Sequence, residues 1–269
     1  MRRGTIAAAA VVAAALGLTG CGSSGSSDNA NGNSDGDSGV SLVNSGTLTV
    51  CSDVPYAPFE DFDKSAPSGF KGFDVDVVSQ IAKDMGVKLA IKDVDFDPLQ
   101  SGVTLNSGQC DLGASAMTIT DARKKHLDFS DPYYDSEQSL LVPVGSDVKT
   151  IDDLAGKDLG VQKGTTGEAY AKEHVKDAKS IISYKDDGTE FQALKAGTVA
   201  ALLQDLPVNL THTADGKYTV VQKYDTGEQY GLAMKKGNTA LLDAVNKALK
   251  DMRADGTYQK IYDTYFKTK

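Results

Sequence analysis

The chain has 269 residues, of which 40% are hydrophobic and 24% charged, and a formal net charge of −9 at pH 7. Behind the N-terminal segments described below, roughly 225 residues remain, enough for one large hydrophobic core or two medium lobes. The acidic balance argues against nucleic acid and against an anionic membrane surface as partners, since both attract basic proteins.

The N-terminus has the pattern of a lipoprotein signal peptide. Arg2 and Arg3 precede an uncharged stretch, TIAAAAVVAAALGLTG, that is too short for an ordinary membrane-spanning helix. The stretch ends at a lipobox, Leu-Thr-Gly-Cys, which predicts cleavage before Cys21 and a diacylated cysteine. We therefore expect a signal peptide over 1–20 and a mature net charge of −11, because −9 loses Arg2 and Arg3. The alternative is an ordinary cleaved signal with a chance cysteine.

Residues 22–40 contain almost nothing that a core would bury. The segment, GSSGSSDNANGNSDGDSGV, has the composition of a flexible linker. We expect residues 21–45 to tether a folded domain to the outer face of the cell membrane. The predicted location is therefore lipid-anchored and extracytoplasmic, and no second hydrophobic span follows in the sequence.

Strand-like and helix-like segments alternate in two blocks after the tether. In the first block, the predicted strands cover 46–52, 88–94 and 110–116, and the predicted helices cover 72–87 and 97–108. In the second block, the strands cover 158–164, 180–185 and 199–205, and the helices cover 165–175 and 187–197. Two helices, 238–256 and 257–267, follow. This alternation predicts an α/β fold with mostly parallel sheets flanked by helices.

Two cysteines remain once Cys21 is assigned to the lipid anchor. In an oxidising exterior, Cys51 and Cys110 form an even pair that favours a disulfide. However, Cys110 begins its predicted strand while Cys51 nearly ends its own, which would separate them too far for a bond. Both outcomes stay open.

Polar residues follow several of the predicted strands. In open α/β sheets, ligands bind beyond the carboxyl ends of the strands. The residues at these ends are 53–56, 95–96, 115–118, 163–167 and 204–205. They supply small hydroxyls, glycines, two aromatic rings and, among their acids, two well-placed carboxylates, Asp53 and Asp205. No nucleophile, base or metal cluster stands out, so the set favours a binding site over a catalytic centre.

Arg123 follows the third of these groups and has an unusual local context. Thr120 has the character of an N-cap, with 121–123 as the first helical turn. A cation does not suit the positive end of a helix dipole. A bound anion would resolve the conflict; the alternative is a solvated surface arginine.

Seven motifs, in order along the chain, resemble the polar-amino-acid branch of the bacterial extracellular solute-binding proteins of family 3. They are YAPFE, GFKGFDVDVVSQIAKDMG, MTITDARKKHLDFSDPYY, GVQKGTTGEAY, LLQD, QYGLAMKKGN and MRADGTYQKIYDTYF. The resemblance implies an amino-acid receptor of an ABC importer with a two-lobe, type II periplasmic-binding-protein-like fold. Lobe 1 would be 46–134 plus 231–269 and lobe 2 would be 138–227, joined by two crossing strands with hinges near 134–136 and 229–231.

The resemblance also assigns the two poles of the ligand. Arg123 matches the arginine that binds the α-carboxylate, for which a planar guanidinium is well shaped. Ser115, Ala116 and Thr118 match the stretch that offers backbone and hydroxyl groups to the same amino acid. Asp205 matches the partner of the α-ammonium. The alternative for Asp205 is a solvated acid at a strand end.

Further contacts would come from the second lobe and from aromatic rings. Thr165 and Thr166 stand where a strand turns into a helix, and backbone N–H groups at a helix start favour the carboxylate. Their alternative is a plain turn. Tyr56 and Phe96 match positions that sandwich the ligand side chain, with a core role as the alternative.

Asp53 and Gln162 bear on which amino acid is bound. An acid at the far end of the pocket suits a guanidinium or ammonium group, although glutamine receptors have an acid there too. Gln162, together with 164–166, looks more like arginine-type members. We expect a basic amino acid, arginine first, with glutamine as the runner-up.

Other functional classes fit the sequence less well. His126, His174 and His212 are scattered without metal-ligand spacing, and no serine-nucleophile elbow is present. A dehydratase of the same fold, using Asp53 or Asp205 as its acid, is the enzyme alternative. We expect a monomeric receptor without catalytic activity, metal or cofactor, whose partners are a free amino acid and a membrane permease.

Overall fold

The structure is a computed structural model that describes residues 40–267. The predicted signal peptide, the predicted anchor Cys21 and most of the predicted tether lie outside the described residues. In the described part, no helix combines the length and the apolar character needed to cross a membrane.

The first lobe is built on a five-stranded sheet in the order β4-β1-β5-β12-β6. Its strands are β1 (Thr47–Ser52), β4 (Lys88–Asp93), β5 (Leu112–Gly113), β6 (Leu127–Phe129) and β12 (Ala233–Lys235). The central strand β1 runs parallel to β4 and β5, whereas β12 is antiparallel to β5 and β6. Three parallel strands, which the sequence predicts, are thus extended by two that it does not.

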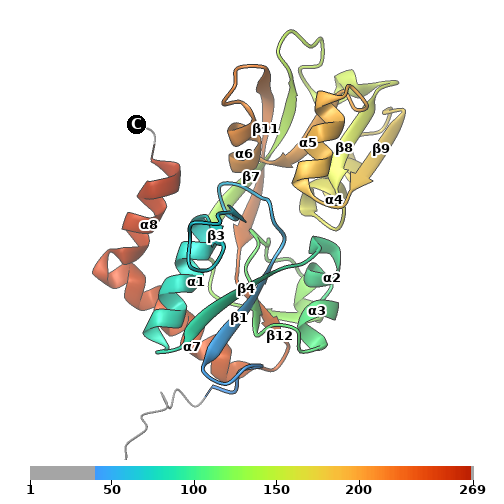
Figure 1. The fold of residues 1–269 in the computed structure, drawn as a ribbon. Coiled ribbons are helices and arrows are strands. Elements are labelled where there is room, and N and C mark those ends of the chain that lie inside the picture. The colour runs from blue at the N-terminus through green and yellow to red at the C-terminus, as the bar shows by residue number, and fades with distance from the viewer. Residues whose placement is uncertain (1–39, 268–269) are drawn as a thin grey trace, which may run out of the picture. The chain divides into compact units, whose positions relative to one another are not determined.

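Helices cover both faces of this sheet (Figure 1). They are α1 (Phe73–Asp84), α2 (Phe96–Gln100), α3 (Val103–Asn106), α7 (Thr239–Asp255) and α8 (Thr257–Phe266). Alternation along β1 divides the core: Leu48 and Val50 pack in the cluster that includes α1 and α7, and Cys51 packs with α2 and α3. A small hairpin, β2 (Asp61–Phe62) and β3 (Phe70–Lys71), precedes α1.

The second lobe is built on a five-stranded sheet in the order β11-β7-β10-β8-β9. Its strands are β7 (Tyr134–Pro143), β8 (Asp158–Gln162), β9 (Ser180–Tyr184), β10 (Ala201–Asp205) and β11 (Tyr218–Tyr230). The flanking helices are α4 (Thr166–His174), α5 (Asp187–Lys195), α6 (Leu206–His212) and the 3-10 turn η2 (Ile151–Leu154). Strands β8, β9 and β10 are parallel, and β7 pairs antiparallel with β10 and β11.

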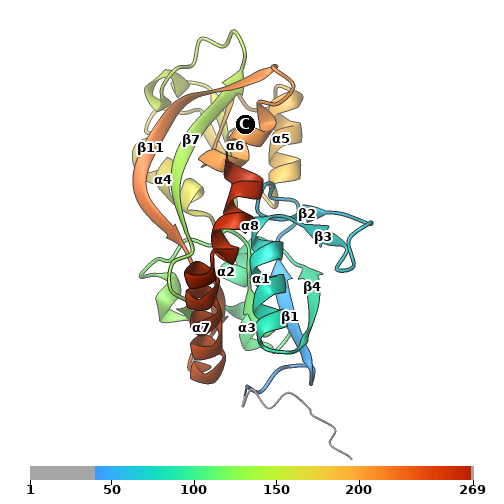
Figure 2. The ribbon, with the colours of Figure 1, turned by 90° about the vertical axis from the view of Figure 1, so that its left-hand side faces the viewer.

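Strands β7 and β11 connect the two lobes. They pair from Tyr134 opposite Tyr230 to Pro143 opposite Tyr218. Figure 2 shows them side by side as they pass from one lobe to the other. The fold is therefore the predicted α/β fold with two lobes and two crossing strands, while the lobe limits 46–134, 231–269 and 138–227 stay predictions.

Two predicted helices are wrong in detail. The helix expected over 97–108 is broken into α2 and α3 by Gly102, whose φ of 82° is left-handed and ends the first helix. The helix expected after Thr120 is only a 3-10 turn, η1 (Arg123–Lys125). The hydroxyl of Thr120 does accept from the backbone N–H of Arg123 at 3.2 Å, but one turn carries little dipole.

Cys51 and Cys110 are joined by a disulfide, with a Cα–Cα distance of 5.8 Å. The strand that follows Cys110 begins only at Leu112 and pairs with β1 so that Leu112 lies opposite Val50. Cys110 therefore lies in the loop before the strand, whereas the predicted strand boundaries placed it within the strand and too far from Cys51. The bond links β1 to the loop before β5 and constrains the unfolded chain.

Candidate functional site

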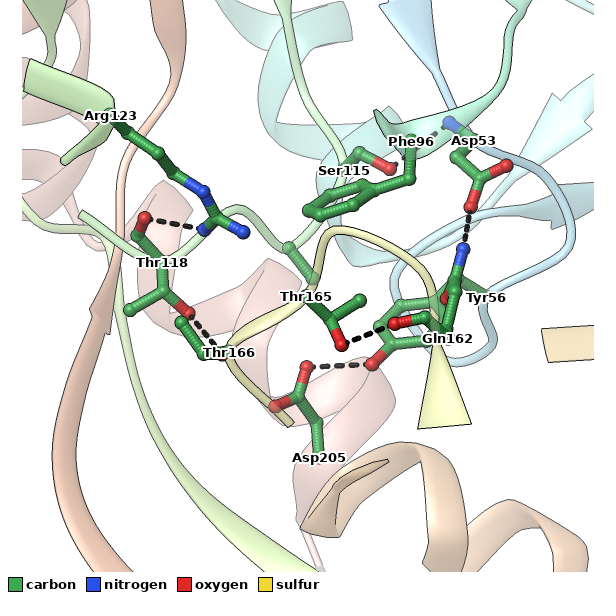
Figure 3. A pocket seen from close by; sticks show the side chains of 11 residues that line it. Asp53, Tyr56, Phe96, Ser115, Thr118, Arg123, Gln162, Thr165, Thr166 and Asp205 are labelled. Atoms are coloured by element: carbon green, nitrogen blue, oxygen red, sulfur yellow. Dashed lines mark hydrogen bonds between the residues drawn. The ribbon is translucent and has the colours of Figure 1, made fainter. Parts of the chain in front are cut away.

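A small cavity lies where residues from both lobes meet (Figure 3). It is lined by Asp53, Tyr56, Phe96, Ser115, Ala116, Thr118, Arg123, Gln162, Thr165, Thr166 and Asp205. These are the residues that the sequence predicts as ligand contacts. The structure brings them together, and their binding role stays a prediction.

The strands place these side chains at one edge of each sheet. Asp53 follows β1 directly, and Ser115 follows the end of β5. In the second lobe, Gln162 is the last residue of β8 and Asp205 the last of β10. Because the carboxyl ends of parallel strands meet at the same sheet edge, residues far apart in sequence line one cavity.

Two buried acids shape the first-lobe side of the cavity. Asp74 accepts a hydrogen bond from the backbone N–H of Ala116 at 2.8 Å, and Ala116 has an unusual φ of 44°. Glu60 accepts from the hydroxyl of Ser115 at 2.6 Å, and that hydroxyl accepts from the backbone N–H of Asp53 at 3.0 Å. The loop that contains Ser115 and Ala116 is therefore fixed by hydrogen bonds to the two buried acids.

Arg123 is buried, with 4% of its surface exposed. Its guanidinium donates to the carbonyls of Thr118 at 2.7 Å and Gly164 at 3.0 Å and to the side chain of Gln100 at 3.4 Å, and it lies 5.2 Å from the ring centroid of Phe96. All three acceptors are neutral. Burial lowers the pKa of Arg123 to about 10, so it stays charged at neutral pH.

This environment corrects the interpretation of Arg123 as a cation misplaced on a helix dipole. The local helix is too short to matter, and the residue is not a surface arginine. Its unusual feature is a permanent charge placed in the interior with neutral oxygens as its hydrogen-bond acceptors. Burying a charge is costly unless it is paired, so the site favours an anionic group beside this guanidinium.

Asp205 marks the opposite pole of the cavity. It is 7% exposed and accepts hydrogen bonds from the hydroxyl of Tyr56 at 2.7 Å and the amide of Gln138 at 2.5 Å. Burial, and after it the nearby carboxylate of Glu228, raise its pKa to about 7. A bound cation would favour the ionised form and so relieve the cost of burial.

Asp53 lies at a second acidic position. Its carboxylate is 4% exposed and accepts from the side-chain amide of Gln162 at 2.5 Å. Burial raises the pKa of Asp53 to about 7, against the opposing effect of the Gln162 hydrogen bond. Besides that amide, no hydrogen-bond donor within residues 40–267 reaches the Asp53 side chain.

Direct contacts hold the lobes closed around the cavity. The Tyr56–Asp205, Asp53–Gln162 and Arg123–Gly164 hydrogen bonds each join the first lobe to the second. At the exposed rim, Lys163 pairs with Asp97 at 2.9 Å. An exposed pair of this kind contributes at most about 1 kcal/mol, so the buried hydrogen bonds matter more for closure.

Gln138 and Glu228 are functional candidates that the sequence did not reveal. They lie on β7 and β11, the two crossing strands, whose extents the sequence did not predict beyond the hinge positions. Glu228 is 8% exposed and accepts from the hydroxyls of Thr118 at 2.6 Å and Thr166 at 2.7 Å. The sequence offered one indication of their role, which is that an amide and an acid lie close to the predicted hinges. Among residues 40–267, no cluster of His, Cys, Asp and Glu is arranged to hold a metal ion.

The raised pKa values predict that the ligand-free protein loses stability as pH rises. Asp53, Asp74 and Asp205 have folded pKa values of about 7, against an unfolded value near 3.9. The folded state therefore binds more protons between these values, and its advantage is lost as pH climbs through about 7. We expect a higher melting temperature at pH 5.5 than at pH 8, measured by circular dichroism. A melting temperature that rises over this interval would contradict the prediction.

Comparisons with known proteins agree with the fold. The model of bacterial extracellular solute-binding proteins, family 3, matches residues 48–268. The L-cystine-binding protein TcyJ of Escherichia coli (strain K12) is 34% identical over 225 residues, 82% of this chain and 83% of its own. The glutamine-binding protein GlnH of an ABC transporter of Bacillus subtilis (strain 168) is 37% identical over 211 residues, 76% of each chain.

A solved structure also matches closely. An ancestral arginine-binding protein bound to arginine is 40% identical, with a TM-score of 0.77, covering 82% of this chain and 98% of its own. The agreement extends over both lobes rather than one motif. The chain therefore belongs to the bacterial extracellular solute-binding proteins, family 3.

Proposed function

We propose that the protein is the lipid-anchored, extracytoplasmic receptor of an amino-acid ABC importer. It binds a free basic L-amino acid, arginine first, between its lobes and delivers it to a membrane permease. It acts as a monomer and catalyses no reaction. Anchoring through Cys21 would hold it at the outer face of the cell membrane.

The observation that carries this proposal is the separation of charge inside the cavity. A buried guanidinium, Arg123, lies at one pole and a buried carboxylate, Asp205, at another. A free amino acid presents the complementary carboxylate and ammonium. Both poles become paired when it binds, and closure of the lobes strengthens the pairing by excluding water. The opposite charges of the ligand thus satisfy two groups that are costly to bury alone.

Asp53 supports a basic side chain. The cavity is lined by two acids and one cation, so a zwitterion leaves Asp53 as a further negative group. A guanidinium or ammonium at the far end of the ligand would neutralise it. The spread of ligands named among the relatives does not select one, and the choice of arginine rests on this third charge.

Glutamine is the second candidate, favoured by a specific contact. The amide of Gln162 donates to Asp53 at 2.5 Å. A neutral amide therefore already satisfies this acid, and a ligand amide would take the same place. A dehydratase is less favoured; the pKa of about 7 at Asp53 and Asp205 would suit acid–base chemistry, and consumption of a cyclic acid such as prephenate would establish it.

The proposal is tested by thermal unfolding of the full chain with each of the twenty common amino acids. A ligand that binds only the folded state at 100 times its Kd adds about 2.7 kcal/mol to the free energy of unfolding. We expect shifts with arginine and lysine. A shift with glutamine alone would transfer the assignment to glutamine, and no shift with any amino acid would overturn the proposed function.

Asp53→Asn should separate the two ligands. The change removes a charge but keeps the shape, so we expect affinity for arginine to fall at least about thirtyfold, since losing one member of a buried charge pair costs about 2–5 kcal/mol. Affinity for glutamine should change much less. Asp95→Asn is the matched control, because Asp95 is exposed and outside the cavity. Equal losses for arginine and glutamine in calorimetric titrations would argue against a side-chain role for Asp53.

A further inference from the structure

We propose that Glu228 sets the polarity of the ligand site by accepting hydrogen bonds from the hydroxyls of Thr118 and Thr166. The two hydroxyls then turn only lone pairs toward the ligand, and they accept from its ammonium group. Glu228 is thus a positioning residue that acts through two cavity residues. The inference rests on the proposed function, because it concerns how the same site orients an amino acid.

Glu228 is the acceptor in each of its four side-chain hydrogen bonds. One carboxylate oxygen accepts from the hydroxyls of Thr118 at 2.6 Å and Thr166 at 2.7 Å. The other accepts from the amide of Gln138 at 3.1 Å and the hydroxyl of Thr226 at 3.0 Å. A carboxylate only accepts, so each of these four groups donates to Glu228.

The consequence for the two threonines follows from their chemistry. A hydroxyl has one proton and two lone pairs. Once the proton is directed to Glu228, the oxygen offers only acceptor capacity to the cavity. Thr118 and Thr166 both line the cavity, one from each lobe, and face each other at 3.4 Å (Figure 3). A freely rotating hydroxyl would donate to a carboxylate as readily as it accepts from an ammonium.

The position of the two hydroxyls agrees with an ammonium pole. The amide of Gln138 joins Glu228 to Asp205, with distances of 3.1 and 2.5 Å. The hydroxyls held by Glu228 are therefore connected through one amide to the acid proposed to bind the ammonium. The guanidinium of Arg123 instead donates to the backbone carbonyl of Thr118. An amino acid in the reversed orientation would place its carboxylate against oriented lone pairs.

Glu228 lies on a crossing strand between the lobes, so its orientation of the two threonine hydroxyls depends on closure of the lobes. A register shift between Tyr224 and Glu228 interrupts the pairing of β11 with β7 just before the residue. Such irregularities redirect side chains. One carboxylate oxygen of Glu228 accepts a hydrogen bond from a hydroxyl of each lobe, Thr118 and Thr166. Both hydroxyls are therefore oriented together only when the lobes are closed.

The test compares two ligands that differ only in the α-amino group, L-arginine and 5-guanidinopentanoic acid. Calorimetric titration of the full chain gives the ratio of their affinities. In Glu228→Gln, we expect this ratio to fall at least about tenfold, chiefly through weaker binding of arginine. The matched control is Glu173→Gln, the same chemical change at an exposed residue of α4 outside the cavity; its ratio should equal that of the wild type.

A second variant keeps the test decisive if Glu228→Gln folds poorly. Thr118→Val removes one of the oriented hydroxyls and should lower the same ratio, whereas Thr118→Ser should restore it. A ratio unchanged in both Glu228→Gln and Thr118→Val would overturn the inference, as would equal weakening of the two ligands, which indicates a merely structural role.

The wild-type result separates this inference from the proposed function. If the wild type binds glutamine instead of arginine, the pair becomes glutamine and 4-carbamoylbutanoic acid, and the same fall in the ratio is expected. If the wild type binds no amino acid, the proposed function has failed and the inference fails with it. If the wild type binds and the ratio does not respond, the inference alone is overturned.

Discussion

Arg123→Ala is expected to abolish amino-acid binding, whichever side chain the ligand carries. The guanidinium is the proposed partner of the ligand carboxylate, and removing one partner of a buried ion pair costs about 3–5 kcal/mol. Affinity should therefore fall by about two to four powers of ten, measured by calorimetric titration. Arg123→Lys should lie between, because it keeps the charge but loses the planar bidentate geometry.

The fold should survive this change. In the ligand-free protein, Arg123 donates three side-chain hydrogen bonds to neutral oxygens, but its removal also relieves a buried charge. Arg253→Ala is the control, since Arg253 donates to the carbonyl of Pro132 and lies over the ring of Tyr258, away from the cavity. Undiminished arginine binding by Arg123→Ala, with Arg253→Ala also unchanged, would remove the basis for the carboxylate pole.

Asp205→Asn is expected to produce the second large loss. The asparagine keeps an acceptor for the hydroxyl of Tyr56, which now bonds Asp205 at 2.7 Å, but it removes the charge that would pair with the ligand ammonium. Losing one member of a buried, hydrogen-bonded charge pair costs about 2–5 kcal/mol of binding. Calorimetric titration should show affinity falling by at least about thirtyfold.

The pH dependence of ligand affinity tests the role of Asp205 more directly. Burial raises the pKa of Asp205 to about 7, so part of the ligand-free protein is protonated near neutrality. Binding of the ammonium favours the ionised form, and affinity should rise from pH 6 to pH 8 with release of protons. This dependence should weaken in Asp205→Asn and persist in Asp158→Asn, a control at the opposite end of β8. A wild-type affinity that falls with rising pH would be incompatible with this pole.

The sequence alone was sufficient for the class of fold and for most of the cavity lining. Strand–helix alternation has a strong local signal, because apolar periodicity and strand ends are encoded in neighbouring residues. Asp53 and Asp205 were identifiable because each follows or ends a predicted strand, whereas Gln162 was identified through the family resemblance. Their convergence follows from a general property of parallel sheets, whose carboxyl ends share one edge.

Tertiary structure decided what has no local pattern. The break at Gly102 depends on one left-handed residue within a helical stretch, and the disulfide depends on β5 beginning only at Leu112. The unusual feature of Arg123 is its burial without an anionic hydrogen-bond partner, not a helix dipole. Only packing of both lobes around it creates that environment.

The crossing strands show most clearly which features depend on neighbouring residues and which depend on the folded chain. The sequence by itself determined that two α/β blocks exist and which strand ends carry polar groups, because these depend on neighbours along the chain. The pairing of β7 with β11 joins residues at least 75 positions apart, so nothing near Gln138 or Glu228 in the sequence indicates that they meet Thr118 and Thr166. Hydrogen bonds across such separations form only once the chain is folded, and with them the orientation of the two hydroxyls is decided.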